Sequence, residues 1–220
     1  MARFVELGRV LSDGMAGINP NHAVRVRVHT SREASAERFG GQCSFEMSEV
    51  SFPGPVGTYI DSPYARDAEG RDIAALSLDE LVRPGLLLDL CGLGERHAVL
   101  PSDLPADADY AGRAAIFDFG WADKWNTPAY ERHPFLPRET VEWLLARGAA
   151  MVCVDCRSPD DSEDPARPAH TLCLRAGAFI VENLIGLDAL HGRRFRFFAI
   201  PARVEGATSF PVRAFAEIED

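Results

Sequence analysis

The segment PVGTYIDSPYA, residues 55–65, gathers residue types that can do chemistry. A Gly-Thr turn precedes Tyr59, a carboxylate stands at the centre as Asp61, and Pro63 stiffens the exit. This outline is typical of a metal-binding segment, in which a carboxylate and neighbouring imidazoles supply the ligands. The segment contains no histidine. It therefore indicates either an altered metal site or only the frame of one.

Two polar residues far along the chain are further candidates. His170 closes an acidic loop and precedes the apolar turn Thr-Leu-Cys-Leu, and Glu182 lies in the apolar segment FIVENL. Burying Glu182 after three apolar residues is costly unless it has a partner. Taken separately, each has an ordinary explanation. A lone histidine is more often a structural hydrogen-bonding group than a ligand, and an acid at a strand end can face solvent.

Two short motifs fall short of a cofactor site. Cys153 and Cys156 have the CxxC spacing of zinc and redox sites, but the sequence has no second pair at a suitable spacing. On a strand they would point to opposite faces, which favours buried, inert thiols. Gly92 and Gly94 follow an expected strand, yet His97 occupies the place of a third glycine. We interpret this second motif as a turn.

Two tryptophans follow an expected strand that ends in Asp-Phe-Gly. Trp121 and Trp125 lie in DFGWADKWNTPAY. Aromatic side chains just past a strand end can form the wall of a small-molecule pocket. They can equally cap the core, and the sequence leaves both interpretations open.

The elements that must position these residues are mostly strands. Alternation in AVRVRVH (23–29) predicts a half-buried strand, and a looser alternation follows at 43–51. Short apolar runs are consistent with strands covered on both faces. Three such runs lie at 86–90, 114–119 and 149–155. Two further strand-like segments lie at 193–201 and 211–218.

Helices are fewer. The segment 137–148 begins with Pro137 and ends at Gly148, with Val141, Leu144 and Leu145 on one face. Shorter helical turns are expected at 77–82, 170–176 and 183–190, and the polar segment 157–169 should be a surface loop. The sum is a mixed α/β protein.

Composition narrows the class of protein. The 220 residues show no shift in composition or long linker, which favours one domain over residues 1–220. A net charge of -10 argues against nucleic-acid or anionic-membrane partners. The opening MARFVELGRVLSDG lacks a secretory pattern, and the five cysteines do not suggest a disulfide framework. We therefore expect a cytoplasmic protein without a membrane span.

Together these segments resemble the cyclase family of metal-dependent hydrolases, which includes bacterial kynurenine formamidase and isatin hydrolase. The family frame H-x-G-T-H-x-D-x-P-x-H reads PVGTYIDSPYA here, so its three histidines are replaced by Pro55, Tyr59 and Ala65. AHTLCLRAGAFIVENLIGLDAL (169–190) is similar to a second family motif. Similar stretches at 5–15, 117–125, 137–160 and 200–216 extend the likeness over nearly the whole chain.

The resemblance implies a fold and a set of ligands. The fold is a swivelling β/β/α single domain with a mixed central sheet, assembled as a homodimer or larger homo-oligomer. The retained family ligands are Asp61, His170 and Glu182. The missing histidine at Ala65 is the one associated with proton transfer, which leaves Tyr59 and Tyr64 as substitutes.

The resemblance also implies hydrolysis of a small molecule, either a cyclic amide, a lactone or an aryl-formamide. One imidazole and two carboxylates can hold one zinc or manganese ion, and Pro55 offers no donor for a second. We expect Tyr59 to point into the pocket, with its hydroxyl near Asp61, Glu182 or a bound ligand.

Two alternatives stay open. Without a metal ion, repulsion between Asp61 and Glu182 would raise one pKa, and the pair could catalyse cyclisation, dehydration or isomerisation. The other alternative is a protein that keeps the pocket and has no turnover.

Overall fold

A computed structural model describes residues 3–16 and 23–219. Residues 1–2, which belong to the opening segment discussed above, and residues 17–22 and 220 lie outside the described part. The strands are β1 (Arg3–Glu6), β2 (Arg25–Thr30), β3 (Met47–Ser51), β4 (Tyr59–Asp61), β5 (Val82–Asp89), β6 (Ala114–Asp118), β7 (Met151–Val154), β8 (Phe179–Glu182), β9 (Arg194–Phe198), β10 (Ser209–Pro211) and β11 (Phe215–Glu219).

The helices are short. They are α1 (Arg32–Arg38), α2 (Leu78–Leu81), α3 (Arg138–Ala146) and α4 (Pro168–Arg175). Single 3₁₀ turns are η1 (Pro63–Ala65), η2 (Ile73–Ala75), η3 (Pro101–Asp103), η4 (Ala122–Lys124), η5 (Pro128–Arg132) and η6 (Leu187–Leu190). Within the described residues, none of the helices is long and apolar enough to cross a membrane.

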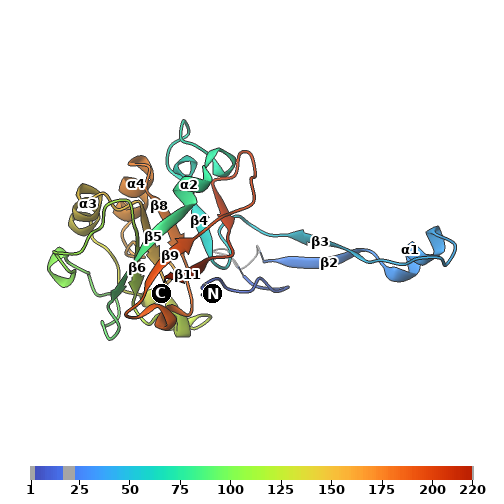
Figure 1. Ribbon diagram of the computed structural model, residues 1–220, viewed down its shortest axis with the longest axis horizontal. Coiled ribbons are helices and arrows are strands. Elements are labelled where there is room, and N and C mark those ends of the chain that lie inside the picture. Colours follow the sequence, from blue (N-terminus) through green and yellow to red (C-terminus); the bar gives the residue numbers. More distant parts are fainter. Residues whose placement is uncertain (1–2, 17–22, 220) are drawn as a thin grey trace.

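Nine of the strands form one mixed, curled sheet in the order β1-β11-β9-β5-β6-β7-β8-β4-β10 (Figure 1). β5 through β8 run parallel, and the strands on either side of them are antiparallel. β5 pairs with different neighbours along its length, and the sheet curls at this strand. Its first residues, 82–84, pair with β9, and residues 85–89 pair with β6. A side chain at Gly85 would collide with the ring of Phe195, so only glycine fits this turn.

The core lies on both faces of this sheet. Alternate residues of β7 show the division: Val152 and Val154 pack with α3 and α4, whereas Cys153 packs with the curled β9 and β11 strands on the other face. Cys156 lies in the first of these two clusters and therefore faces away from Cys153. The expected α/β single domain with a mixed sheet is confirmed.

β2 and β3 form a separate two-stranded sheet. With α1 they make a long arm, residues 25–51, which extends away from the body (Figure 1). The expectation that residues 23–29 form a half-buried strand is wrong, because β2 is exposed except at Thr30. Its alternation produces an amphipathic ribbon without a core beneath it.

Several other boundaries differ from those expected. The strand expected at 211–218 is divided between β10 and β11, because the two segments pair with different neighbours. The segment 157–169 is not all surface loop, since Ser158, Pro159 and Asp160 are buried. The strand expected at 86–90 is half-exposed at Leu86 and Leu87, where β9 no longer covers the edge of β5.

Candidate metal centre

Three buried side chains converge from distant parts of the chain. His170 Nε2 lies 3.3 Å from Asp61 Oδ2 and 3.3 Å from Glu182 Oε1. One ligand-type atom from each residue lies within 4.8 Å of the others. This triad combines one imidazole nitrogen with two carboxylate oxygens, which is a donor set that divalent zinc accepts.

Strand register explains why the carboxylates meet. β4 and β8 are antiparallel neighbours in which Tyr59 lies directly opposite Glu182. Residues 59 and 61 point to the same face of β4, whereas Ile60 between them points into the core. Asp61 also lies opposite Ser209 of β10, whose hydroxyl donates a hydrogen bond to Asp61 Oδ1. The sequence alone did not indicate Ser209.

His170 is oriented by a residue that the sequence analysis missed. Its Nδ1 lies 2.6 Å from Asp160 Oδ2, so the ring can present Nε2 to the triad. Asp160 also accepts hydrogen bonds from the backbone N–H groups of Ala169 and His170, at 2.6 and 3.2 Å. It thus satisfies donors in the first turn of α4 and positions His170 at the same time.

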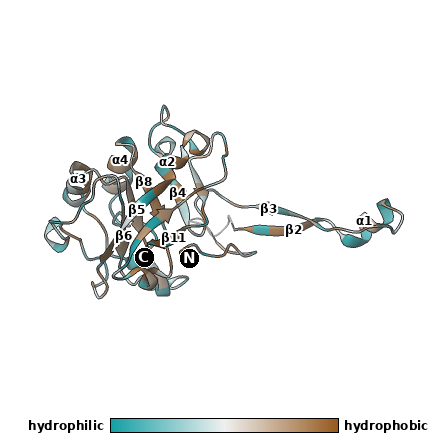
Figure 2. Cartoon of the chain, viewed as in Figure 1, coloured by the Kyte–Doolittle hydropathy of each residue, from teal (hydrophilic) through white to brown (hydrophobic). Residues whose placement is uncertain are grey.

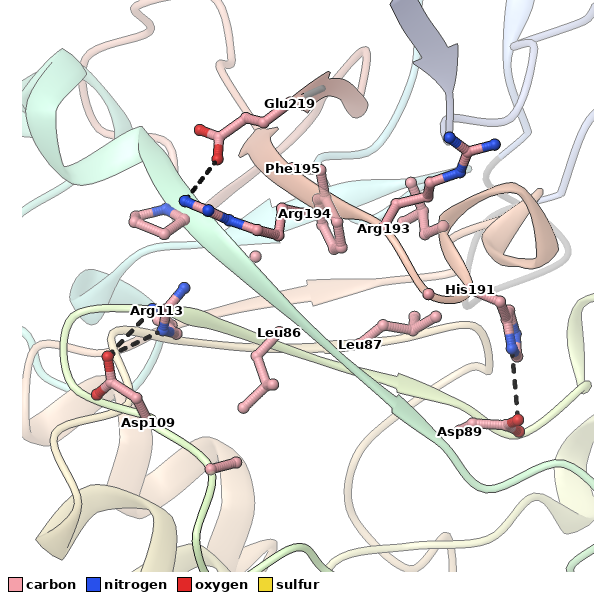
Figure 3. A pocket seen from close by; sticks show the side chains of 15 residues that line it. Leu86, Leu87, Asp89, Asp109, Arg113, His191, Arg193, Arg194, Phe195 and Glu219 are labelled. Atoms are coloured by element: carbon pink, nitrogen blue, oxygen red, sulfur yellow. Dashed lines mark hydrogen bonds and ion pairs between the residues drawn. The ribbon is translucent and has the colours of Figure 1, made fainter.

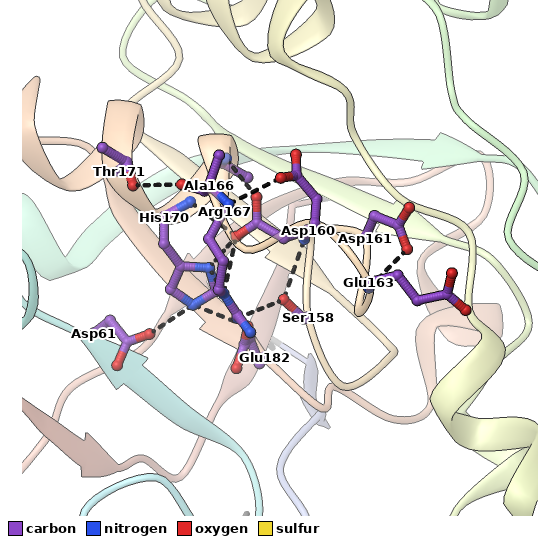
Figure 4. A network of polar contacts seen from close by, with 12 residues as sticks. Asp61, Ser158, Asp160, Asp161, Glu163, Ala166, Arg167, His170, Thr171 and Glu182 are labelled. Carbon is purple, nitrogen blue, oxygen red and sulfur yellow. Dashed lines mark hydrogen bonds and ion pairs between the residues drawn. The ribbon is translucent and has the colours of Figure 1, made fainter.

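The network continues behind Asp160 (Figure 4). Arg167 Nε lies 3.5 Å from Asp160 Oδ2, and Arg167 Nη2 donates to the Ser158 hydroxyl at 3.0 Å. Arg167 has a positive φ of 43° at the residue before α4. A non-glycine residue in this region is strained, and the hydrogen bonds around Asp160 hold it there.

Tyr59 faces the triad, in the orientation that the sequence analysis anticipated. Its hydroxyl donates a hydrogen bond to Glu182 Oε2, and the side chain is buried. Burial, followed by the neighbouring charge of Glu182, holds the pKa of Tyr59 well above its ordinary value. The phenol therefore stays protonated at neutral pH and acts as a hydrogen-bond donor.

The charges of the triad are coupled. Burial lowers the pKa of His170, but its bonds to Asp160, Asp61 and Glu182 outweigh burial and leave that pKa well above the ordinary value. Burial raises the pKa of Glu182, and the charge of Asp61 raises it further, while His170 opposes both. Like-charge repulsion is thus a smaller cause of the raised pKa than desolvation.

The residues fit one metal ion. Glu182 Oε1 is buried without a hydrogen-bond partner, and it faces His170 Nε2. Protein donors already engage Asp61 Oδ1 and Glu182 Oε2, so each carboxylate has one oxygen left. The triad thus offers ligands that could hold a single ion, and the Tyr59 hydroxyl engages the other oxygen of Glu182.

The other replaced positions offer no ligand. Pro55 lines a pocket beside Tyr59, and Ala65 packs against the core from η1. Tyr64 is 37% exposed, and none of the hydrogen bonds found at the triad in the described residues involves it. The structure therefore places Tyr59, but not Tyr64, in contact with the triad.

A pocket of about 250 Å³ opens next to Tyr59. Its walls include Val56, Trp125 and Tyr130, and the last two rings meet edge to face at 5.1 Å. Arg157 and Glu131, which form an ion pair, also line it. Of the two tryptophans, Trp125 lines the pocket, whereas Trp121 is buried in the core.

Asn183 joins the pocket to the triad. Its side-chain amide donates to Gly57 O at 2.7 Å and accepts from the Tyr130 hydroxyl at 2.7 Å. Its own carbonyl accepts from the Thr58 hydroxyl at 2.7 Å. These bonds fix the turn before Tyr59 against the residue that follows Glu182.

A larger groove lies elsewhere. It has a volume of about 860 Å³ and runs between β5 and the start of β9 (Figure 3). Several of its charged side chains are paired with one another, as Arg113 with Asp109, His191 with Asp89 and Arg194 with Glu219 show. No triad residue lines it. The smaller pocket, by contrast, is lined by Tyr59, whose hydroxyl bonds Glu182 of the triad.

Comparison with known proteins agrees with this architecture. The Cyclase family model matches residues 5–161. The kynurenine formamidase of Maricaulis maris (strain MCS10) is 29% identical over 178 residues, which cover 80% of this chain and 82% of that protein.

Solved structures share the fold. Isatin hydrolase A from Ralstonia solanacearum aligns with a TM-score of 0.86 at 22% identity, over 99% of this chain and 92% of that one. A structure from Bacillus stearothermophilus, described as a metal-dependent hydrolase, aligns with a TM-score of 0.75 at 19% identity, over 99% of this chain and 98% of that one. The chain belongs to the cyclase family, and it folds as the isatin hydrolases do.

Proposed function

We propose that this protein is a hydrolase that uses at most one metal ion to open the C–N bond of a small aryl-formamide or cyclic amide. The observation that carries the proposal is the triad of Asp61, His170 and Glu182, with one unpartnered carboxylate oxygen directed at the imidazole. The likeness to a kynurenine formamidase and to an isatin hydrolase supports the substrate class.

The triad residues would hold zinc or manganese, both of which accept imidazole and carboxylate ligands. A divalent ion in such a site acidifies a water molecule and polarises a carbonyl group. Asp160 fixes the orientation of the His170 ring through Nδ1, which leaves Nε2 for the ion. The chain therefore supplies a pre-oriented set of three ligand residues for the ion, Asp61, His170 and Glu182.

Tyr59 can supply a polar hydrogen-bonding group in place of the family histidine at position 65, where this chain has Ala65. Its hydroxyl stays protonated and bonds Glu182, and its side chain lines the pocket, so it can turn that hydrogen bond to a substrate oxygen. This assignment gives the tyrosine a catalytic role without requiring a phenolate.

The pocket suits a substrate of one or two rings. Its volume of about 250 Å³ and its aromatic wall at Trp125 and Tyr130 favour a planar group. Tyr59 lines this pocket and bonds the buried Glu182, so the reacting carbonyl would be placed beside the Tyr59 hydroxyl.

A second candidate function is acid–base catalysis without metal. The continuous chain Tyr59–Glu182–His170–Asp160 favours it, because each neighbour in the chain can exchange a hydrogen bond. Such a relay could support cyclisation, dehydration or isomerisation of the same class of substrate.

Metal content separates the two. The protein would be purified without added metal and analysed by elemental mass spectrometry, before and after soaking in zinc and manganese. About one equivalent, lost in His170→Gln and kept in His97→Gln, supports the hydrolase, since His97 is an exposed histidine that pairs with Asp103 and lies outside the triad. No bound metal after soaking contradicts it.

Activity is the second half of the test. N-formyl aromatic amines, isatins and lactones would be screened with and without a chelator. Hydrolysis that the chelator abolishes supports the proposal, and turnover that survives complete metal removal favours acid–base catalysis. Metal binding without turnover on any of these classes would contradict the proposed substrate range.

A further inference from the structure

One edge of β5 is only partly paired. Residues 82–84 pair with β9, whereas residues 85–89 pair with β6 on one side and, among the described residues, with no strand on the other. β9 has turned away at this point, because its residues 194 and 195 pair with β11 and not with β5. A stretch of sheet edge about 13 Å long is therefore open between the two strands.

Backbone hydrogen bonds show which groups point out of this edge. Leu81 O accepts at 3.1 Å from the first backbone N–H after β9, and Leu90 N donates at 2.9 Å to the last carbonyl of β6. Because the backbone groups of successive residues point to opposite sides of a strand, the odd-numbered residues face β9 and the even-numbered residues face β6. The N–H and C=O groups of Leu87 and Asp89 consequently point into the groove where β9 has turned away.

A strand placed in this groove would meet apolar side chains on both of its faces. On one side of the sheet, Leu87 packs with the buried Leu190, and on the other side Leu86 and Ala108 pack against the second cluster of the core. All four residues line the groove of about 860 Å³ (Figure 3). The groove therefore offers both a hydrogen-bonding edge and apolar contacts to the same ligand.

Side chains close the groove at both ends of the open edge. The ring of Phe195 occupies the space beside Gly85. At the other end, His191 Nδ1 lies 3.4 Å from Asp89 Oδ2, and His191 Nε2 lies 2.9 Å from Asp118 Oδ2. These contacts fix the two ends, so the open edge is preformed and has room for about three or four extended residues.

The open edge carries none of the usual protection against pairing. Residues 85–88 read Gly-Leu-Leu-Leu, which is an apolar run of β5 (Figure 2). Natural proteins commonly protect a free edge with a charged residue, a proline or a covering segment. The proline of this strand, Pro84, lies where β9 still pairs. An apolar edge with free donors and acceptors is the kind of surface to which an extended peptide adds as a further strand.

Charge in the groove favours an acidic peptide. Three arginines line it, and two of them, Arg113 and Arg194, pair with acids of the same groove. The third, Arg193, forms no ion pair within the part of the chain that the structure describes. The chain as a whole has a net charge of -10 and repels acidic partners in general. A free arginine beside the open edge is thus a local attachment point for a carboxylate.

From these observations we propose that the groove between β5 and β9 binds an extended acidic peptide of another protein, which adds to the edge of β5 as a short strand. The peptide backbone pairs with Leu87 and Asp89. Its apolar side chains pack on Leu86 and Leu190, and one of its carboxylates pairs with Arg193. Because only three or four residues pair, the contact is smaller than a standard stable interface, and we expect micromolar affinity. The proposal is independent of the metal centre.

A phage-displayed library of random octapeptides provides the probe. It would be selected on the full-length chain and counter-selected on Leu87→Pro, which removes an N–H that points into the groove and leaves the pairing of β5 with β6 intact. We expect the enriched peptides to alternate apolar residues, to contain an acid, and to bind the wild type with a Kd of roughly 1–100 μM. Leu87→Pro should bind them at least tenfold more weakly. No enriched peptide, or equal binding to the variant, overturns the proposal.

A matched proline variant tests the direction of the edge. Leu86→Pro places the proline where the backbone faces β6, so it should break the central pairing and be much less stable than Leu87→Pro. Urea denaturation of both variants measures the difference. If Leu87→Pro is the less stable of the two, the edge at residue 87 is not free and the proposal is wrong.

A charge variant tests the groove without altering the backbone. Arg193→Glu should weaken binding of the enriched peptide by roughly tenfold or more, because it replaces the attraction for a carboxylate by repulsion. Arg175→Glu, at the exposed end of α4 and outside the groove, is the matched control and should bind as the wild type does. Equal affinity in the two variants contradicts the proposed position of the peptide.

Amide hydrogen exchange, followed by NMR with and without the enriched peptide, identifies strand pairing itself. The amides of Leu87 and Asp89 should exchange at least tenfold more slowly in the complex. Those of Leu86 and Leu88 face β6 and should not change. Protection without this alternation, or protection elsewhere in the chain, would show that the peptide does not add to β5 and would overturn the proposal.

Discussion

At the scale of single residues, Tyr59 is the aromatic side chain whose hydroxyl contacts the triad. A tyrosine stands where the family frame has a histidine, and its hydroxyl engages one oxygen of Glu182. A residue kept only to fill space would not need a hydroxyl at this depth, since an unpaired one is costly to bury. The bond to Glu182 instead holds a carboxylate in the orientation that the triad needs.

Replacing Tyr59 with phenylalanine should lower turnover on the proposed substrates by about 10²–10³-fold, because it removes a positioned hydrogen-bond donor to the substrate oxygen. It should also lower the free energy of unfolding by about 1–3 kcal/mol, since Glu182 Oε2 loses a buried donor. Steady-state kinetics and urea denaturation measure the two effects. Tyr110→Phe is the control, because that hydroxyl bonds Pro105 O, in a loop that does not line the pocket. Unchanged turnover in Tyr59→Phe would limit the tyrosine to a structural role.

The sequence identified residues of the site only where they belong to a family motif. Asp61, His170 and Glu182 could be proposed from the family pattern, and the structure brings the three together. Asp160 and Ser209 could not, because their importance comes from hydrogen bonds across 10 and 148 residues. No local pattern distinguishes a buried aspartate in a polar, proline-rich loop from its solvent-exposed neighbours.

At the scale of elements, one residue holds the turn before β4 to the end of β8. Asn183 has a positive φ of 63° and bonds both Gly57 O and the Tyr130 hydroxyl. This connection keeps Tyr59 and Glu182 in register although three residues of the family frame have changed. The turn before β4 is thus held by hydrogen bonds of Asn183 that do not involve Pro55, Tyr59 or Ala65.

Asn183→Ala should therefore lower the free energy of unfolding by about 3 kcal/mol or more, since it leaves buried groups unpaired and strains the backbone. Asn183→Gly loses the same side-chain bonds but accepts the positive φ, so it should be about 1–2 kcal/mol less damaging. Urea denaturation of the two variants gives the difference. Equal losses would show that the backbone conformation of residue 183 relaxes freely.

The short helix α2 depends on Glu80. This side chain accepts from Ser77 N at 3.0 Å and pairs with both terminal nitrogens of Arg71, at 2.9 and 2.6 Å. The hydrogen bonds from Arg71 are the main reason that the pKa of Glu80 falls from 4.5 to about 2. The folded state therefore binds the proton less readily than the unfolded chain does.

A depressed carboxyl pKa stabilises the fold above the unfolded value and loses that effect as pH falls through the folded value. Wild type should thus have a higher Tm than Glu80→Gln at pH 7, with the gap narrowing between pH 4.5 and pH 2. Thermal unfolding across this range measures it, with Glu69→Gln on the adjacent exposed turn as control. A gap that is constant with pH would mean that packing, and not charge, accounts for the difference.

At the scale of the whole molecule, periodicity predicted strands well where a core covers them. It could not show how the strands are distributed among sheets. β2 alternates as a half-buried strand should, yet the β2–β3 ribbon leaves the body, and only the three-dimensional path of the chain reveals it. The switch of β5 between β9 and β6 likewise depends on the fit of Phe195 over Gly85.

The three residues of the triad come from three different elements, β4, α4 and β8. β4 is a three-residue strand near one edge of the sheet, α4 covers a face, and β8 lies between them. An ion bound by Asp61, His170 and Glu182 would link all three elements across more than a hundred residues. Because it would bind the folded state and not the unfolded chain, it should stabilise the whole domain.

Chelation should therefore lower the melting temperature of the wild-type protein. Free ion at a hundred times its dissociation constant contributes about 2.7 kcal/mol. In a chain of 220 residues this corresponds to about 5–10 °C in Tm. His170→Gln should melt at the same temperature with and without chelator, whereas His97→Gln should respond as the wild type does. A wild-type Tm that does not respond to chelator or to added zinc and manganese would show that the fold holds no ion there, and the bonds among Tyr59, Glu182, His170 and Asp160 would then have to stabilise the centre alone.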